Sequence, residues 1–215
     1  IVHSELPHGV YEALLGEKSF QEVVIETNEC DLHLAPATSD LAGANVELVD
    51  AIGREYRLDK AISAIRPNYD FVLIDCPPSL GLLTVNGLVA ADTLLIPVQA
   101  EYYALEGLTH LMETVSLVRE HLKAELRIIG AVITMYDGRT NLATDVFNEI
   151  QKFFPEELFQ TVVPRSIRLA EAPSHGKTIF SYDPFSKGAA AYRSLGEEVL
   201  MRSAASLISS QERLT

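Results

Sequence analysis

The sequence predicts an α/β fold: a doubly wound, mostly parallel sheet with helices on both faces. Short apolar segments alternate with longer segments of helical periodicity along most of the 215 residues. One segment, residues 71–75, begins with four consecutive apolar residues, as is typical of a parallel strand that helices cover on both sides. We therefore expect a single domain, residues 1–215, organised around one sheet.

The elements follow from periodicity and from turn-forming residues. A short helix is expected at residues 10–15, ended by Gly16, and a longer one at residues 41–65, interrupted by Gly53, with Val46, Val49, Ile52 and Tyr56 on its apolar face. Further helices are expected at residues 82–89, 105–122, 142–153 and 188–207, and strands at residues 31–36, 71–75, 93–98, 127–134 and 159–163. Residues 164–186 are expected to be irregular, because they contain Pro164, Pro173, Gly176 and Pro184.

The composition is that of a soluble globular protein, with 47% hydrophobic and 22% charged residues. No apolar run approaches the roughly eighteen residues of a membrane span, and residues 1–20 lack the pattern of a secretory signal. The two cysteines, Cys30 and Cys76, have no metal-ligand spacing. We therefore expect a cytoplasmic protein with free thiols.

The net charge of −13 argues against a general nucleic-acid binder. The charge is unevenly distributed, however. Residues 161–193 contain five basic residues and two acidic residues, a local charge of +3. This basic stretch is the candidate surface for a polyanion.

Asp75 stands at the end of the expected strand 71–75 and is followed by the rigid Pro77-Pro78 turn. Ligands of open α/β sheets lie beyond the carboxyl ends of the strands. A carboxylate there suits the Walker B role, in which it holds Mg²⁺ directly or through water beside the phosphates of a nucleotide. The alternative is that Asp75 only caps the helix that begins near Leu80.

Other strand ends also carry polar residues, at Gln99 and Glu101, after Thr134, and at Arg165. Gly176-Lys177-Thr178 resembles the end of a phosphate-binding P-loop. Glu171 stands where the first glycine of that motif should be, and no strand precedes it. The sequence thus contains a Walker B candidate and no phosphate cradle.

Four motifs together resemble the ParA/Soj family of chromosome- and plasmid-partitioning ATPases, from about residue 10 to about residue 202. They are FVLIDCPPSLG, PVQAEYYALEGL, ITMYDGRTNLATDV and VPRSIRLAEAPSHGKTIFSYDPFSKGAAAYRSLGEEV. The resemblance implies a P-loop-type ATPase that binds ATP and Mg²⁺, forms a homodimer with ATP and binds DNA without sequence preference. It also implies activation by a ParB-like partner and a location in the cytoplasm at the nucleoid.

The resemblance also implies roles for individual residues. Asp75 corresponds to the catalytic Walker B aspartate that holds Mg²⁺. Five residues correspond to the nucleotide site: Gln99, Glu101, Met135, Pro164 and Arg165. Arg168, Lys187 and Arg202 correspond to DNA-contacting residues. Phe185 departs from the family pattern, in which a cation is common, and we expect it to weaken the basic patch.

The largest departure concerns the KGGVGKTT-like loop with which the family opens, because residues 1–30 do not match it. The chain thus resembles a member that lacks about 50–60 amino-terminal residues, and we expect it to be inactive as an ATPase by itself. Two alternatives remain open. One is a MinD-like membrane-surface regulator, although residues 200–215 contain only Arg202 and Arg213 as cations against Glu212. The other is a non-catalytic binding module with the same fold.

Overall fold

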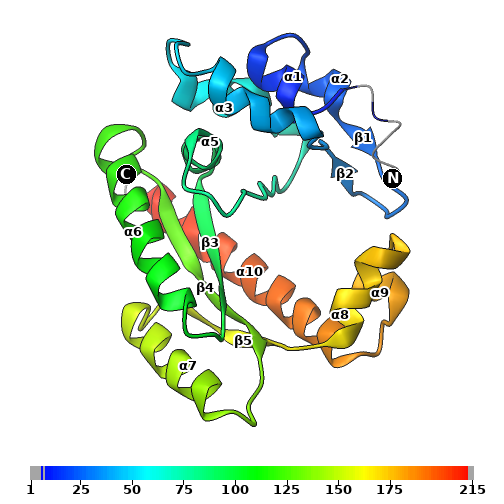
Figure 1. Ribbon diagram of the computed structural model, residues 1–215, viewed down its shortest axis with the longest axis vertical. Coiled ribbons are helices and arrows are strands. Elements are labelled where there is room, and N and C mark those ends of the chain that lie inside the picture. The colour runs from blue at the N-terminus through cyan, green and yellow to red at the C-terminus, as the bar shows by residue number, and fades with distance from the viewer. Residues whose placement is uncertain (1–5, 7, 213–215) are drawn as a thin grey trace. The chain divides into compact units, whose positions relative to one another are not determined.

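The computed structural model describes residues 6 and 8–212, with side chains up to residue 204. The chain divides into two compact units, one formed by residues 1–92 and 113–126, the other by residues 93–112 and 127–215. Figure 1 shows the elements of both units. Helix α6 (Ala104–His121) begins in the second unit and ends in the first.

The second unit contains a parallel sheet of three strands in the order β3 (Thr93–Gln99), β4 (Arg127–Tyr136) and β5 (Leu158–Pro164). Side chains of β4 alternate between its faces. Ala131 and Ile133 pack with residues of α6 and α7 (Asn141–Phe153), whereas Val132 packs with Leu195 of α10 (Lys187–Glu212). Figure 1 shows α6 and α7 on one side of the sheet and α10 on the other. The expected α/β class, with helices on both faces of a parallel sheet, is therefore confirmed.

The first unit is mostly helical. Its helices are α1 (Val10–Leu15), α2 (Phe20–Val23), α3 (Ala44–Glu47), α4 (Arg57–Ile62) and α5 (Leu82–Ala90), with 3-10 turns at Ser39–Gly43, Arg54–Tyr56 and Arg66–Asn68. Two short antiparallel strands, β1 (Ile25–Glu26) and β2 (His33–Leu34), complete it. Gly16 ends α1 in the left-handed conformation, as expected. The core includes Leu14, Leu48 and Ile62.

The helix expected at residues 41–65 is broken into short pieces. These are the 3-10 turn Ser39–Gly43, helix α3, the 3-10 turn Arg54–Tyr56 and helix α4. Gly53 adopts φ +66° and starts a new turn, so the 3.6-residue period does not continue across it. Leu48 is buried while Ile52 is 98% exposed, and Val46, Val49 and Tyr56 are also exposed. The predicted apolar face was therefore wrong.

The strand expected at residues 71–75 is absent from the sheets of the described residues. Phe71, Val72 and Leu73 are exposed, Leu73 by 88%. A strand requires a hydrogen-bonded neighbour, and apolar, β-branched side chains alone do not supply one. The expected irregular stretch 164–186 contains short helices instead: α8 (Ile167–Glu171), η5 (Ala172–His175) and α9 (Ile179–Tyr182).

Candidate functional site

Asp75 is exposed and forms no hydrogen bond or ion pair with another described residue. The loop that follows it is anchored by Thr84, whose hydroxyl donates to the carbonyl of Ser79 at 2.6 Å. Helix α5 begins at Leu82 with Gly81 as its N-cap and has no side-chain cap. Asp75 therefore does not cap the next helix, and its carboxylate is free to bind a cation.

Cys76, next to Asp75, is half-buried against α5. A Cβ atom placed on Gly87 would lie 2.5 Å from its Sγ atom, so the thiol packs directly on the helix backbone. Burial, followed by the charge of Asp75, raises the pKa of Cys76. The raised pKa favours the protonated thiol, so the surroundings of Cys76 do not activate it as a nucleophile.

In the second unit, the carboxyl ends of the three strands bring predicted site residues together. Gln99 lies opposite Thr134 in the register, and Tyr136 lies opposite Pro164. The Arg165 backbone N–H donates to the Tyr136 carbonyl at 3.0 Å. Its guanidinium donates to Glu101 Oε1 at 2.6 Å.

Met135, at the same end of β4, adopts φ +51°. A left-handed backbone in a residue other than glycine costs on the order of 1–3 kcal/mol and is concentrated at ligand-binding positions. The Met135 side chain is exposed. Met135, Glu101, Pro164 and Arg165 thus occupy one edge of the second unit, whereas Asp75 belongs to the first unit.

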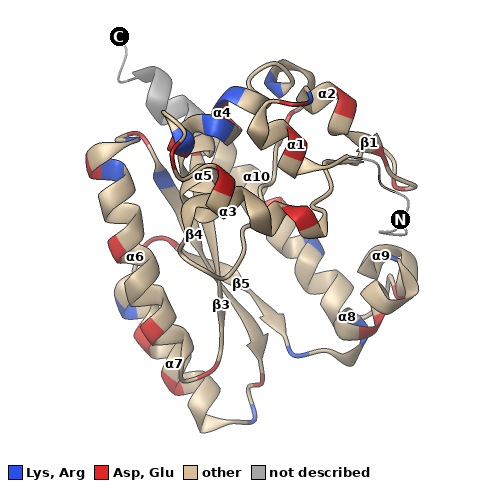
Figure 2. Ribbon diagram, turned by 45° about the horizontal axis from the view of Figure 1, so that its top comes forward, with Lys and Arg blue, Asp and Glu red and all other residues tan. Residues whose placement is uncertain are grey.

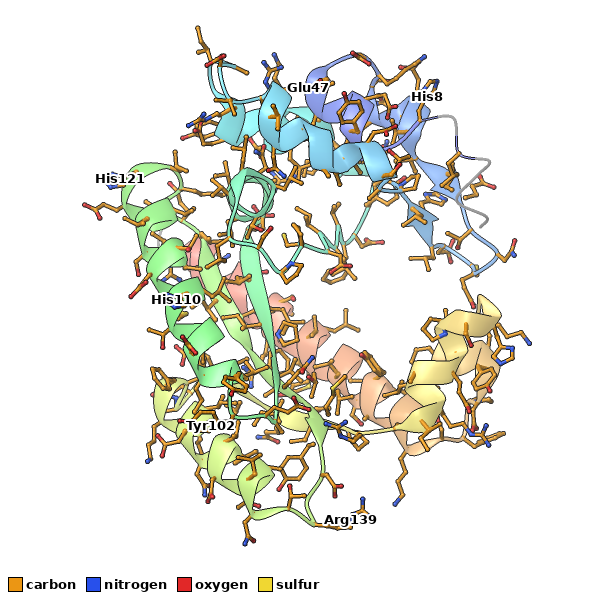
Figure 3. All side chains as sticks on the ribbon, in the orientation of Figure 1. His8, Glu47, Tyr102, His110, His121 and Arg139 are labelled. Atoms are coloured by element: carbon orange, nitrogen blue, oxygen red, sulfur yellow. The ribbon has the colours of Figure 1, made fainter. Side chains whose placement is uncertain are left out.

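Two further charged residues at this edge were not predicted as site residues. Asp137 accepts from Arg139 through the backbone N–H at 3.1 Å and the guanidinium at 2.9 and 2.7 Å. The hydrogen bonds from Arg139, with the charge of Arg165 as a smaller cause, lower the pKa of Asp137 to about 2. Figure 3 shows Arg139 and Tyr102 at the end of the unit where β3 and β4 terminate. The Asp137-Gly138 turn directly after a strand was the sequence signal for this pair.

Gly176-Lys177-Thr178 does not form a phosphate cradle. The backbone N–H groups of Gly176 and Lys177 donate to the carbonyls of Pro173 and Ala172, where they close the η5 turn. The Thr178 hydroxyl caps α9 by accepting from Ser181 N at 3.2 Å. The donors that would hold phosphate oxygens are therefore engaged, which confirms the rejection of a P-loop here.

The predicted DNA-contacting residues differ in their exposure and in the number of protein groups that they already bind. Arg168 is paired with Glu171 at 3.1 Å and Asp183 at 3.4 Å. Hydrogen bonds to Glu171 and then to Tyr182 raise the pKa of Arg168. Lys187 is exposed and forms no ion pair with the rest of the described chain. Figure 2 shows basic and acidic positions side by side around α8.

Arg202 is largely enclosed by protein. Its guanidinium donates to the carbonyls of Ile129, Glu157 and Leu158 and to Glu198, and it lies 4.0 Å from the centroid of the Phe159 ring. Glu198 in turn accepts from the backbone N–H groups of Gln160 and Thr161 at 2.9 and 3.0 Å. Burial raises the pKa of Glu198, and these hydrogen bonds outweigh burial and lower it. The ion pair between Arg202 and Glu198 therefore connects α10 to β5, the edge strand of the sheet.

The residues on which the membrane-surface alternative depends lie largely outside the described part of the chain. Arg213 lies outside the described residues, as does the side chain of Glu212. Within the part of the chain that the structure covers, no helix is both long and apolar enough to cross a bilayer.

The described residues meet the needs of a nucleotide only in part. The free carboxylate of Asp75 fits one ligand position of Mg²⁺, directly or through water. Between residues 8 and 204, no three metal-ligating side chains are grouped together. The donors for the phosphates are not found at Gly176 and Lys177. Asp75 thus offers one ligand position for Mg²⁺, and the turn at Gly176 and Lys177 offers no free backbone donors for phosphate.

Comparison with known families and proteins gives a consistent assignment. A family model described as an AAA domain matches residues 1–128. The sporulation initiation inhibitor protein Soj of Bacillus subtilis is 49% identical over 199 residues, which cover 93% of this chain and 79% of that protein. The chromosome partitioning protein ParA of Myxococcus xanthus is 48% identical, with 90% of this chain and 68% of that protein covered.

Among solved structures, the chain resembles a cobyrinic acid a,c-diamide synthase from Mycobacterium smegmatis with bound ADP and magnesium. The TM-score is 0.80 at 34% identity, over 95% of this chain and 76% of that one. The cell division ATPase MinD of Pyrococcus furiosus has a TM-score of 0.70 at 24% identity, over 92% and 77% of the two chains, which shows a shared fold alone. By its identity with these relatives, the chain belongs to the Soj/ParA family of chromosome-partitioning ATPases.

Proposed function

We propose that this chain is the main part of a partitioning ATPase that uses ATP and Mg²⁺ to control its binding to DNA. The observation that carries the proposal is the identity of 49% with Soj of Bacillus subtilis over 93% of the chain. The grouping of Glu101, Met135, Pro164 and Arg165 at one sheet edge supports it, because that edge is where α/β folds bind ligands.

Asp75 is proposed as the residue that holds Mg²⁺, and its exposed, unpaired carboxylate supports this role. The metal, when bound, neutralises charge on the phosphates. Gln99 and Glu101 are proposed to face the nucleotide, and Met135, Pro164 and Arg165 to surround its base. The ion pair between Arg165 and Glu101 holds both side chains at the strand ends in defined positions.

DNA is proposed to be held without sequence preference by Arg168, Lys187 and Arg202, through phosphate contacts of an ATP-bound homodimer. Of the three, Lys187 can bind a phosphate with the least rearrangement, because it is exposed and has no described ion-pair partner. Arg202 would have to exchange its bonds to protein carbonyls for bonds to phosphate. A ParB-like partner is proposed to stimulate hydrolysis, at the nucleoid in the cytoplasm.

The chain by itself is proposed to be inactive as an ATPase. Asp75 supplies one metal ligand, and the donors of the Gly176 loop are engaged in helix caps. Phosphate binding needs several backbone N–H groups that point to one place, with a lysine beside them.

The test uses a chimaera in which the amino-terminal segment of the Bacillus subtilis relative precedes this chain. Hydrolysis of ATP is measured with and without random-sequence duplex DNA, and retention of that DNA on filters is compared between Mg·ATP and Mg·ADP. The proposal expects hydrolysis by the chimaera and DNA retention that depends on ATP. Equal retention with both nucleotides would contradict it.

A further inference from the structure

Phe185 is 97% exposed, although phenylalanine is usually buried. It lies in the turn between α9 and α10, directly after Pro184. The turn is tightly held. The backbone N–H and the hydroxyl of Ser186 both donate to the Asp183 carbonyl, at 3.1 and 2.8 Å, and Ser186 Oγ accepts from Ala189 N at 3.1 Å. A ring fixed in this way loses little backbone freedom when it meets a ligand.

Basic residues are found on the elements next to the turn, together with the acidic residues Glu171 and Asp183. Lys187 is the second residue after Phe185 and is exposed. The guanidinium of Arg193 lies 5.5 Å from the centroid of the Phe180 ring, on the preceding helix. Arg168 Nε lies 3.4 Å from Asp183 Oδ2 and so balances the acidic residue of the turn. The exposed ring therefore projects from residues 161–193, a stretch with a local charge of +3 in a chain whose net charge is −13.

We propose that Phe185 contacts DNA bases directly, by stacking on or inserting between them, while Lys187 holds a neighbouring phosphate. The inference rests on the proposed DNA-binding function and adds a contact of a different chemical kind. Apolar side chains that enter a base step are held beside cations in this way, because the cations bring the backbone close enough for the ring to reach the bases.

The surface fits a nucleic acid better than a lipid bilayer. Membrane-surface binding draws on the broad apolar face of one amphipathic helix. Here the exposed apolar side chains come from separate short elements, Ile167 on α8, Phe180 on α9 and Phe185 in the turn. The flat π face of one ring matches one base, and stacking tolerates any base sequence. Phe185 therefore strengthens binding without making it sequence-specific.

Stacking and ion pairing respond differently to salt, and this separates them. Phosphate contacts release counterions, so each one adds about one unit to the salt slope. A stacked ring releases none. Phe185→Ala should therefore weaken binding about tenfold at every salt concentration without altering the slope. Lys187→Ala should lower the slope by about one unit.

The experiment measures binding of a duplex that contains 2-aminopurine, across a salt series, by the chain at low ionic strength and by the chimaera with Mg·ATP. Phe185→Trp should retain affinity and should change the fluorescence of 2-aminopurine on binding, as the parent does because the ring disturbs base stacking, whereas Phe185→Ala should lose both effects. Phe153→Ala is the matched control, because Phe153 is also exposed but lies at the end of α7, outside the basic stretch.

The outcomes distinguish this inference from the proposed function. If Phe185→Ala binds with the affinity and the 2-aminopurine fluorescence change of the parent while Lys187→Ala is impaired, the ring contact is refuted and DNA binding stands. If the parent itself does not bind DNA, both fail. If Phe185→Ala instead reduces sedimentation with vesicles of phosphatidylserine and phosphatidylcholine and leaves DNA binding intact, the ring serves a membrane and the inference is overturned.

Discussion

Arg165 Nη2 lies 2.6 Å from Glu101 Oε1, which joins two residues 64 positions apart in the sequence. The pair links the segments that follow β3 and β5, and the Arg165 backbone is also bonded to Tyr136 at the end of β4. All three strand ends are thereby held in one arrangement. Both side chains are more than half exposed, so the ion pair itself contributes little stability and serves mainly to position groups.

Asp137 gives a prediction about pH. Its pKa of about 2 lies below the ordinary value of 3.8 because Arg139 donates to the carboxylate. A lowered pKa in the folded state means that the interaction stabilises the fold above about pH 4 and is lost as the pH falls toward 2. Carboxyl titration by NMR should show this value for Asp137, and Arg139→Ala should return it toward 3.8. A pKa near 3.8 in the parent would contradict the hydrogen-bonded geometry.

Arg202 should contribute strongly to stability. Arg202→Ala removes donors from three backbone carbonyls at the β4–β5 boundary and leaves Glu198 without its cation. We expect the free energy of unfolding to fall by about 2–3 kcal/mol, because part-buried acceptors lose charged partners. Denaturant unfolding measures it, with Arg193→Ala as the control, since Arg193 is exposed and its guanidinium lies over the Phe180 ring. If Arg202→Ala and Arg193→Ala lower the free energy of unfolding equally, the stabilising role assigned to Arg202 is refuted.

Asp75→Ala in the chimaera should abolish ATP hydrolysis and leave the fold intact, because the carboxylate is exposed and has no partner to lose. Asp70→Ala is the control, since Asp70 is an exposed carboxylate five residues earlier. Turnover is measured together with circular dichroism. If Asp75→Ala hydrolyses ATP within about threefold of the parental rate, the activation barrier has changed by less than about 1 kcal/mol. The assignment of Asp75 as the metal ligand would then be wrong.

Charge reversal of the basic stretch should separate DNA binding from folding. Arg168→Glu with Lys187→Glu should weaken retention of random duplex by the ATP-bound chimaera and reduce its salt slope by about two units. Lys152→Glu is the control for a single charge reversal on α7, outside the stretch. An unchanged affinity and slope in the double variant would place DNA binding elsewhere.

Much of the second unit could be predicted from its sequence. Strands β3, β4 and β5 and helices α6, α7 and α10 lie within a few residues of their expected positions, because local period and long-range packing agree there. In the first unit they agree for α1 and α5, which lie where they were expected, and disagree in the segments between them. The apolar residues 71–74 favour a strand but have no strand beside them, and Gly53 interrupts the helical period that placed Ile52 inside.

The periodicity of the sequence could not predict the contacts of the site between side chains that are far apart in the sequence. The pairing of Glu101 with Arg165 and the enclosure of Arg202 depend on the register of β4 with β5. That register has irregular shifts, which local sequence does not encode. The pairing of Asp137 with Arg139 was easier to predict, because the two residues are close in sequence on an Asp-Gly turn.

Isothermal titration with Mg·ATP tests the central claim most directly, namely that these residues supply the metal ligand and the base-side edge but not the phosphate donors. The 215-residue chain is compared with the chimaera under the same conditions. We expect no binding tighter than roughly micromolar by the chain, because the backbone N–H groups of Gly176 and Lys177 are engaged within their own turn, and clear binding by the chimaera. A dissociation constant of a few micromolar or tighter for the chain alone would contradict the account.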